Sequence, residues 1–284
     1  MGRPRNLASF KDYSRALKNG RGLGTGPDYL PWLRANDVPS RGKSTKIYGI
    51  KTERTHHLLS SIESNFLLIA EYHHLVIDIR EGFPLFPIDL VLRVANEAGI
   101  NYPISTKSND PCVLSTDFVL TLWDRKEITY LPVAVKASED LNDPKVAERL
   151  EIERLWWASL GEPWKLVTDQ QVNKIAARNI EWFSAPLRGR KHNLLGENYK
   201  EGMEKLAEIV DPGVYEWSGL VNQISQEVNL TTDKTMNLLK AAIWHKFIVV
   251  NMDTQVEIAK DNVIEVIDIN NMAMEDRTNV EFSS

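Results

Sequence analysis

Three residue types that can act together on a phosphate lie in the first half of the chain. Glu63 stands in an apolar, helix-like segment, Asp117 begins a strand-like run, and Lys136 comes near the end of the next run. Hydrolysis of a phosphodiester needs a divalent cation to orient the phosphate and an activated water. Carboxylates are hard oxygen ligands for Mg²⁺ or Mn²⁺, and a lysine positions the water or stabilises the charge that develops on phosphorus.

These residues must be brought together by the fold. The stretch STDFVLTLWDRKEITYLPVAVKAS (115–138) indicates two strands joined by a turn. If the strands are antiparallel, Asp117 and Lys136 meet at one end of the hairpin. A helix bearing Glu63 can reach that end, and the carbonyl of Val135 is a further oxygen ligand.

Each of the three residues also has a simpler interpretation. Glu63 can lie on a polar stripe of its helix, Asp117 can cap a turn, and Lys136 can extend its ammonium from a strand edge into water. Their combination with the order of the surrounding elements favours the chemical interpretation.

The order of elements around these residues indicates one α/β domain built on a mixed sheet. Ser9 is the expected N-cap of a helix at 10–18, and a Gly- and Pro-rich loop follows. Thr55 is the expected N-cap of a helix that begins at His56 and carries Glu63. Further elements are expected in chain order: a strand at 75–85, a short helix at 87–100, the hairpin, a helix at 143–161, a buried strand at 163–169 and a helix at 170–184.

The C-terminal part has a different organisation. Residues 186–193 indicate a linker, and three helices and a strand–turn–strand unit over 247–259 follow. This is the outline of a small winged-helix domain. We therefore expect a basic arm and loop at 1–50, an endonuclease-like domain at 51–185 and a winged-helix-like domain at 186–284.

Charge is distributed unevenly along the chain. Residues 1–56 hold 12 Lys and Arg against 4 Asp and Glu, whereas residues 186–284 hold 10 against 16. A basic arm before an acidic body suits a protein that meets an anionic polymer, although a solvated basic terminus explains the arm equally well. The acidic C-terminal part favours protein docking over DNA binding.

The expected contacts to DNA phosphates lie in the basic arm. They are Lys11, Arg15, Lys18, Arg21, Arg34, Arg41, Lys43 and Lys46. The single cysteine, the absence of a signal-like N-terminus and the lack of a long apolar stretch indicate a cytoplasmic protein without a membrane partner.

Several motifs together resemble a known family. The acid, the hairpin and the lysine resemble the PD-(D/E)xK nuclease superfamily, which has the restriction-endonuclease fold. Within it, the chain resembles the TnsA family over about residues 15–185, in motifs that occur in the right order. They are GRGLGTGPDYLPWL (20–33), HHLLSSIE (56–63), IDIREGFPL (77–85), STDF (115–118), VAVK (133–136) and NIEWF (179–183).

The resemblance implies a specific activity. TnsA proteins are endonuclease subunits of heteromeric transposases, including those tied to CRISPR guide complexes, and cut the 5′ strand at transposon ends. The DDE transposase TnsB cuts and joins the 3′ ends, and the AAA+ regulator TnsC contacts the C-terminal domain. By this resemblance Glu63, Asp117 and Lys136 are catalytic, Glu63, Asp117 and the Val135 carbonyl hold Mg²⁺ or Mn²⁺, and an intact site takes two ions.

One position departs from the family pattern. The residue two before Lys136 is commonly Gln, or Glu in the wider superfamily, but here it is Ala134. A methyl group cannot bind a metal. The chain is then a natural variant that recruits another oxygen, a weakened or inactive nuclease retained for assembly, or a laboratory variant. The alternative function is a non-catalytic adaptor that binds DNA ends and partner proteins.

Overall fold

The computed structural model describes residues 7–37, 44–188, 199–256 and 263–270. The chain divides into two compact units, Met1–Val172 and Asn173–Ser284. The division therefore falls before helix α5 (Lys174–Ser184), whereas the sequence placed it after residue 185. The reason is that α5 packs against α8 (Thr232–Trp244) of the second unit.

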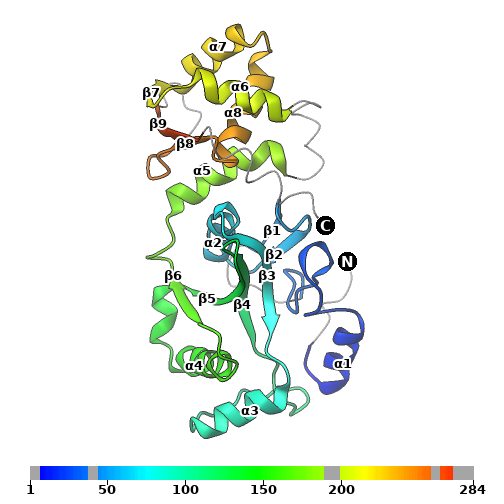
Figure 1. The fold of residues 1–284 in the computed structure, drawn as a ribbon. Coiled ribbons are helices and arrows are strands. Elements are labelled where there is room, and N and C mark those ends of the chain that lie inside the picture. The colour runs from blue at the N-terminus through cyan, green and yellow to red at the C-terminus, as the bar shows by residue number, and fades with distance from the viewer. Residues whose placement is uncertain (1–6, 38–43, 189–198, 257–262, 271–284) are drawn as a thin grey trace. The chain divides into compact units, whose positions relative to one another are not determined.

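A four-stranded mixed sheet forms the centre of the first unit (Figure 1). Its strands follow the order β3-β4-β5-β6, in which β3, β4 and β5 are antiparallel neighbours and β6 runs parallel to β5. Their bounds are β3 Val76–Pro84, β4 Ser115–Trp123, β5 Ile128–Lys136 and β6 Lys165–Thr168. The predicted mixed α/β class is confirmed, although β6 is half-buried rather than buried.

Helices cover both faces of this sheet (Figure 1). Helix α2 (Ser61–Tyr72) packs Leu67 and Ala70 against a cluster that includes Phe118 and Val135. On the other face, α3 (Ile88–Glu97) and α4 (Pro144–Ser159) pack against Val119. A short 3-10 helix, η2 (Ser138–Asn142), joins β5 to α4. Phe118 and Val119 of β4 pack into different clusters on the two faces of the sheet. A one-residue slip would exchange the faces and bring each side chain to the wrong cluster.

The expected helix beginning at His56 is wrong in its first turn. Residues Thr55–Leu58 form strand β2, which pairs antiparallel with β1 (Thr45–Tyr48) in a separate two-stranded sheet. The helix starts at Ser61, and its N-cap is Ser60, whose side chain accepts the N–H of Glu63.

The N-terminal segment is anchored on the edge of the central sheet. Helix α1 (Phe10–Lys18) has the predicted Ser9 cap. The following loop contains a short 3-10 helix, η1 (Gly26–Asp28), and buries Tyr29 and Trp32 almost completely. Trp32 donates its N–H to the carbonyl of Gly82 in β3.

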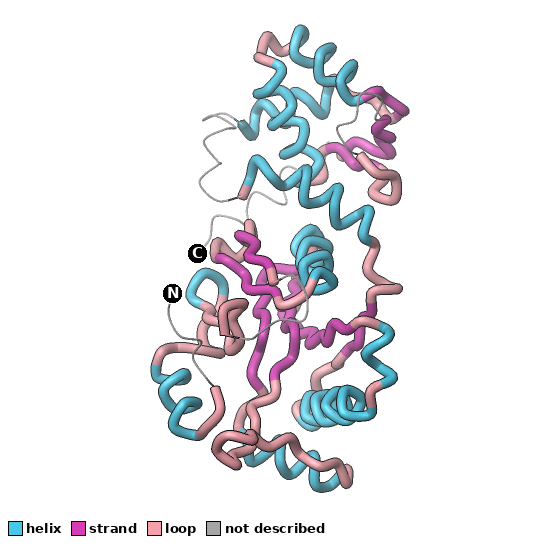
Figure 2. Tube along the Cα trace, turned by 180° about the vertical axis from the view of Figure 1, so that it is seen from behind, coloured by secondary structure: helices cyan, strands magenta, loops and turns pink. Residues whose placement is uncertain are grey.

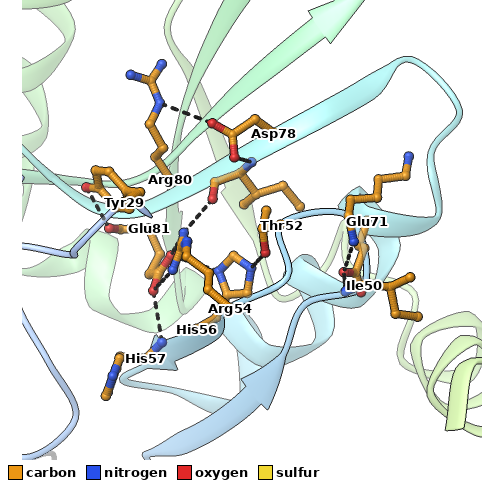
Figure 3. Close-up of polar contacts among 12 residues, drawn as sticks. Tyr29, Ile50, Thr52, Arg54, His56, His57, Glu71, Asp78, Arg80 and Glu81 are labelled. Atoms are coloured by element: carbon orange, nitrogen blue, oxygen red, sulfur yellow. Dashed lines mark hydrogen bonds and ion pairs between the residues drawn. The ribbon is translucent and has the colours of Figure 1, made fainter. Parts of the chain in front are cut away.

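A buried ionic cluster joins this loop, the β1–β2 sheet and β3 (Figure 3). Glu81 of β3 accepts two hydrogen bonds from the Arg54 guanidinium, at 2.9 and 2.6 Å, and lies 2.8 Å from His56 Nδ1. The Tyr29 hydroxyl donates to the backbone carbonyl of Glu81. Although burial alone would raise it, His56 and Arg54 hold the pKa of Glu81 far below its usual value.

The second unit combines helices with a three-stranded antiparallel sheet of order β7-β9-β8 (Figure 2). After α5 and the 3-10 helix η3 (Ala185–Leu187), its elements are α6 Tyr199–Ile209, β7 Gly213–Glu216, α7 Trp217–Glu227, α8, β8 Ile248–Val250 and β9 Val263–Ile269. In the strand–turn–strand unit expected over 247–259, β8 is the first strand, and it pairs with β9. Residues 257–259 of that unit and the linker residues 189–193 lie outside the described residues. Strand β7 was not predicted.

No helix in the described part of the chain is long and apolar enough to cross a bilayer.

Candidate active site

Asp117 and Lys136 meet at the end of the β4–β5 hairpin. One carboxylate oxygen of Asp117, Oδ2, accepts a hydrogen bond of 2.6 Å from Lys136 Nζ and one of 2.7 Å from the N–H of Val135. No described residue donates a hydrogen bond to the other oxygen, Oδ1. The predicted acid–lysine pair is therefore formed, with one acid oxygen still available to a ligand.

Val135 presents its backbone to this site. The N–H and C=O of one strand residue point to the same side of the strand. Because the Val135 N–H reaches Asp117, its carbonyl faces that side as well. The Val135 side chain, in contrast, is buried in the core beneath α2.

Glu63 is held by the start of its own helix. Its carboxylate accepts the N–H of Leu59 at 2.8 Å and the hydroxyl of Ser60 at 3.0 Å, and the Ser60 hydroxyl in turn accepts the N–H of Glu63. This is a variant of the capping box, in which the carboxylate accepts the N–H of Leu59, one residue before the cap, instead of the N–H of the cap residue itself. Burial, and then the negative charge of Asp117, raise the pKa of Glu63 to about 7.

Lys136 remains a cation at neutral pH. Burial by itself lowers the pKa of its ammonium, but the adjacent Asp117 carboxylate, with Glu153 and Glu63 further away, raises it above the usual value. An ammonium with a raised pKa has no lone pair with which to take a proton from water. Its available roles are to orient a phosphate and to stabilise negative charge.

Sequence reasoning missed a fourth ionisable group, Glu153 of α4. Its side chain is buried, and it accepts a 2.8 Å hydrogen bond from the Trp164 indole. The side chain of Thr116, the residue before Asp117, also forms a hydrogen bond with the Glu153 carboxylate. Burial, followed by the charge of Asp117, raises the pKa of Glu153 to about 7. The available signal was an acid on the helix face that carries Trp156 and Trp157.

Replacing Glu153 by glutamine should raise stability at alkaline pH. The pKa of Glu153 is raised from 4.5 to about 7, so its ionisation costs stability as the pH rises through that window. Fully ionised, the group costs about 3 kcal/mol. Urea unfolding in EDTA should show Glu153→Gln more stable than the parent near pH 8 by up to about that amount, and equal to it near pH 4.

The matched control is Glu148→Gln, which changes an exposed acid of the same helix. It should leave the dependence of stability on pH unchanged. An equal effect of both substitutions, or a parent chain whose stability is flat between about pH 4.5 and 7, would contradict the assigned environment of Glu153.

Ala134 lies within this site but supplies no ligand. It is fully buried in β5 and pairs with Leu166 of β6. The hairpin register ends at Phe118 opposite Val133, so the next step places Ala134 level with Asp117. A longer polar side chain at this position would start next to the Asp117 carboxylate.

The donor set suits a hard divalent cation. Glu63, Asp117 and the Val135 carbonyl are oxygen donors, as Mg²⁺ and Mn²⁺ prefer. A cation between the two carboxylates would relieve the repulsion from Asp117, which adds to burial in raising the pKa of Glu63. Among the described residues, no three His, Cys, Asp or Glu side chains are grouped closely enough to hold a metal by themselves.

The expected DNA contacts of the basic arm have different surroundings. Lys11, Lys18 and Lys46 are exposed, and Arg15 is exposed beside its partner Asp12. Arg34 is half-buried, and with Lys46 it adds to burial in lowering the pKa of His57. Both therefore lie close to β2, the strand that leads into the Glu63 cap.

One of these expected contacts needs correction. Arg21 is buried, donates to the carbonyl of Trp32 and forms a 2.7 Å ion pair with Asp37. Its guanidinium holds the loop together and does not face a phosphate. Arg41 and Lys43 lie outside the described residues.

A mixed sheet with an acid and a lysine on one hairpin, joined by a glutamate from the adjacent helix, defines an endonuclease-like domain. The family model described as "TnsA-like endonuclease N terminal" matches residues 73–169, which include Asp117, Lys136 and Glu153. The Escherichia coli "Transposon Tn7 transposition protein TnsA" is 35% identical over 241 residues, covering 84% of this chain and 85% of that protein. The chain belongs to the TnsA family, and thus to the endonuclease subunits of transposases.

Proposed function

We propose that this chain is a metal-dependent endonuclease that cuts the 5′ strand at the ends of a transposon. The observation that carries the proposal is the Asp117 carboxylate, which holds Lys136 and Val135 and keeps one oxygen open at the end of the hairpin. Glu63 of α2 supports it further, because it lies close enough for the charge of Asp117 to contribute to its raised pKa. Membership of the TnsA family supports the substrate and the reaction.

Different residues of this site would bind the metal and the phosphate. Glu63, Asp117 and the Val135 carbonyl would hold Mg²⁺ or Mn²⁺. The bound cation supplies positive charge against the phosphate and acidifies a water. Lys136 orients the scissile phosphate and stabilises the charge that develops on its oxygens. Asp117 fixes Lys136 and is the main reason that the lysine stays protonated. Glu153 adds to this effect when it is ionised.

The proposed partners follow from the family. A TnsB-like DDE transposase would cut the opposite strand, and a TnsC-like AAA+ regulator would bind the second unit. The order of α6, β7, α7, α8, β8 and β9 supports a winged-helix interpretation of that unit, and its acidic charge supports protein docking. Exposed Lys11, Lys18 and Lys46 are the proposed contacts to transposon-end DNA.

Ala134 supports a second candidate function. A family member without an oxygen at this position can serve as a non-catalytic adaptor that binds DNA ends and partner subunits. The two functions differ in whether this chain itself hydrolyses a phosphodiester.

A strand-specific cutting assay separates the two functions. The chain is incubated with its transposase partner, Mg²⁺ or Mn²⁺, and transposon-end DNA labelled on each strand. Nuclease function predicts 5′-strand cutting that EDTA abolishes. Ala134→Gln should increase the rate by about tenfold or more, since it adds an amide oxygen beside Asp117. Cutting by Ala134→Gln alone would mean that the alanine disarms the site, and no cutting by either chain would leave the adaptor function.

A further inference from the structure

Strand β5 has an open edge at the end away from Lys136. Its ladder with β4 runs from Ile128 to Val133, whereas its ladder with β6 begins at Val133 and ends at Lys136. The segment Ile128–Pro132 therefore has β4 on one side and, among the described residues, no strand on the other.

Backbone groups of this segment point into the open side. Trp123, which pairs with Ile128, donates its N–H to Leu75, just before β3, and not to β5. Opposed residues in an antiparallel ladder alternately bond each other and turn away. Ile128 and, two residues later, Tyr130 thus direct their N–H and C=O outward. Pro132, next in this alternation, has no N–H and ends the edge.

A cavity of about 450 Å³ lies beside the edge. Its walls are Leu122, the edge residues 128–131 and the loop 161–163 after α4. The side chains of Ile128 and Tyr130 are 57% and 40% exposed, and Leu160, which precedes the loop, is 49% exposed. The edge of β5 at residues 128–131 thus combines exposed apolar side chains, a cavity and backbone groups that point outward.

The lining of the cavity also carries a negative charge. Its lining has a single charged residue, Glu162, which is half-buried. The Tyr130 ring is held by the Arg80 guanidinium, 5.4 Å from the ring centroid. The contact orients the Tyr130 ring, and the charge of Glu162 favours a cationic ligand group.

We propose that the edge 128–131 binds an extended peptide segment of a partner protein. The segment would place an aliphatic side chain in the cavity and a neighbouring Lys or Arg against Glu162. Extended peptides add to open sheet edges through main-chain hydrogen bonds, while pockets beside the edge select alternate side chains. This binding is independent of the proposed nuclease chemistry.

A second copy of this chain fits the edge less well. Edge-to-edge pairing of two identical chains brings the same surface together on both sides. The acidic Glu162 loop would then face a like charge instead of a cation. A segment of another protein that has both apolar and basic side chains fits the apolar lining and the Glu162 carboxylate.

The test uses the full chain and a labelled heptapeptide that alternates valine and lysine. Fluorescence anisotropy should show saturable binding, and hydrogen exchange should slow at the amides of Ile128 and Tyr130. Tyr130→Pro removes an outward N–H and spares the β4 ladder, whereas Tyr130→Ala removes the side chain alone. The proline variant should bind about tenfold more weakly than the alanine variant, as the loss of one main-chain hydrogen bond requires.

Two further probes keep the test independent of how the proline variant folds. A peptide that is N-methylated at alternate residues should no longer bind the parent chain. The Glu162→Gln variant should bind the lysine-containing peptide more weakly than the parent chain does. Equal affinity of the two Tyr130 variants, protection at other amides, or no saturable binding up to about 1 mM would overturn the proposal. So would amides of Ile128 and Tyr130 that are already protected without peptide, because a second copy or another part of this chain would then occupy the edge.

Discussion

Replacing Asp117 by asparagine should lower 5′-strand cutting by on the order of 10³-fold. The substitution keeps the shape of the side chain and an oxygen that can accept the bonds of Lys136 and Val135. It removes the negative charge that would attract the cation and that raises the pKa of Lys136. The measurement is the rate of strand cutting in the complete transposase assembly, with circular dichroism to show that the fold is retained.

Asp124→Asn is the matched control for this prediction. Asp124 is exposed in the turn of the same hairpin and accepts the N–H groups of Lys126 and Glu127. Its replacement should leave cutting unchanged. If Asp117→Asn cuts as fast as this control, the hairpin carboxylate has no part in the reaction.

Replacing Glu81 by glutamine should destabilise the first unit by about 3–5 kcal/mol, the typical loss when a buried ion pair keeps one charged partner. Arg54 is 7% exposed and would keep its charge without the carboxylate that faces it. His56 would lose the same partner. Urea unfolding at neutral pH measures the loss.

The effect of Glu81 should also depend on pH. Because its pKa is lowered in the folded chain, its contribution is present above the ordinary value of 4.5 and is lost as the pH falls toward the folded value. The difference between parent and Glu81→Gln should therefore shrink in acid. Glu97→Gln, an exposed acid at the end of α3, should cost less than about 0.5 kcal/mol; a similar loss in both variants would remove the special role of Glu81.

The hairpin and its site could be predicted because local chemistry decides them. Two apolar runs and the polar turn between them define β4 and β5, and their pairing alone places Asp117 beside Lys136. Strand β2 could not be predicted in this way. Its one apolar residue, Leu58, also fits the pattern of the helix that follows. Only the pairing of β2 with Thr45–Tyr48 distinguishes the strand from a first helical turn. The capping box from Ser60 to Glu63 was the overlooked local signal.

Other parts of the site depend on tertiary contacts. Glu153 joins the site because α4 packs its buried face over the sheet near Asp117. Arg21 appears in the sequence as one more charge of a basic arm, yet Asp37 and Trp32 bury it. For both Glu153 and Arg21, the fold determines which residues they contact, and the residue type alone does not reveal those contacts.

Binding of Mn²⁺ to the isolated chain tests the central claim most directly. The free ion is measured by electron paramagnetic resonance as it is titrated into the parent chain, Asp117→Asn and Asp124→Asn. A cation held by Glu63, Asp117 and the Val135 carbonyl predicts that Asp117→Asn weakens binding by about tenfold or more, with Asp124→Asn unchanged. Equal binding by all three chains, or no binding by the parent, would contradict a metal-dependent nuclease site at this hairpin.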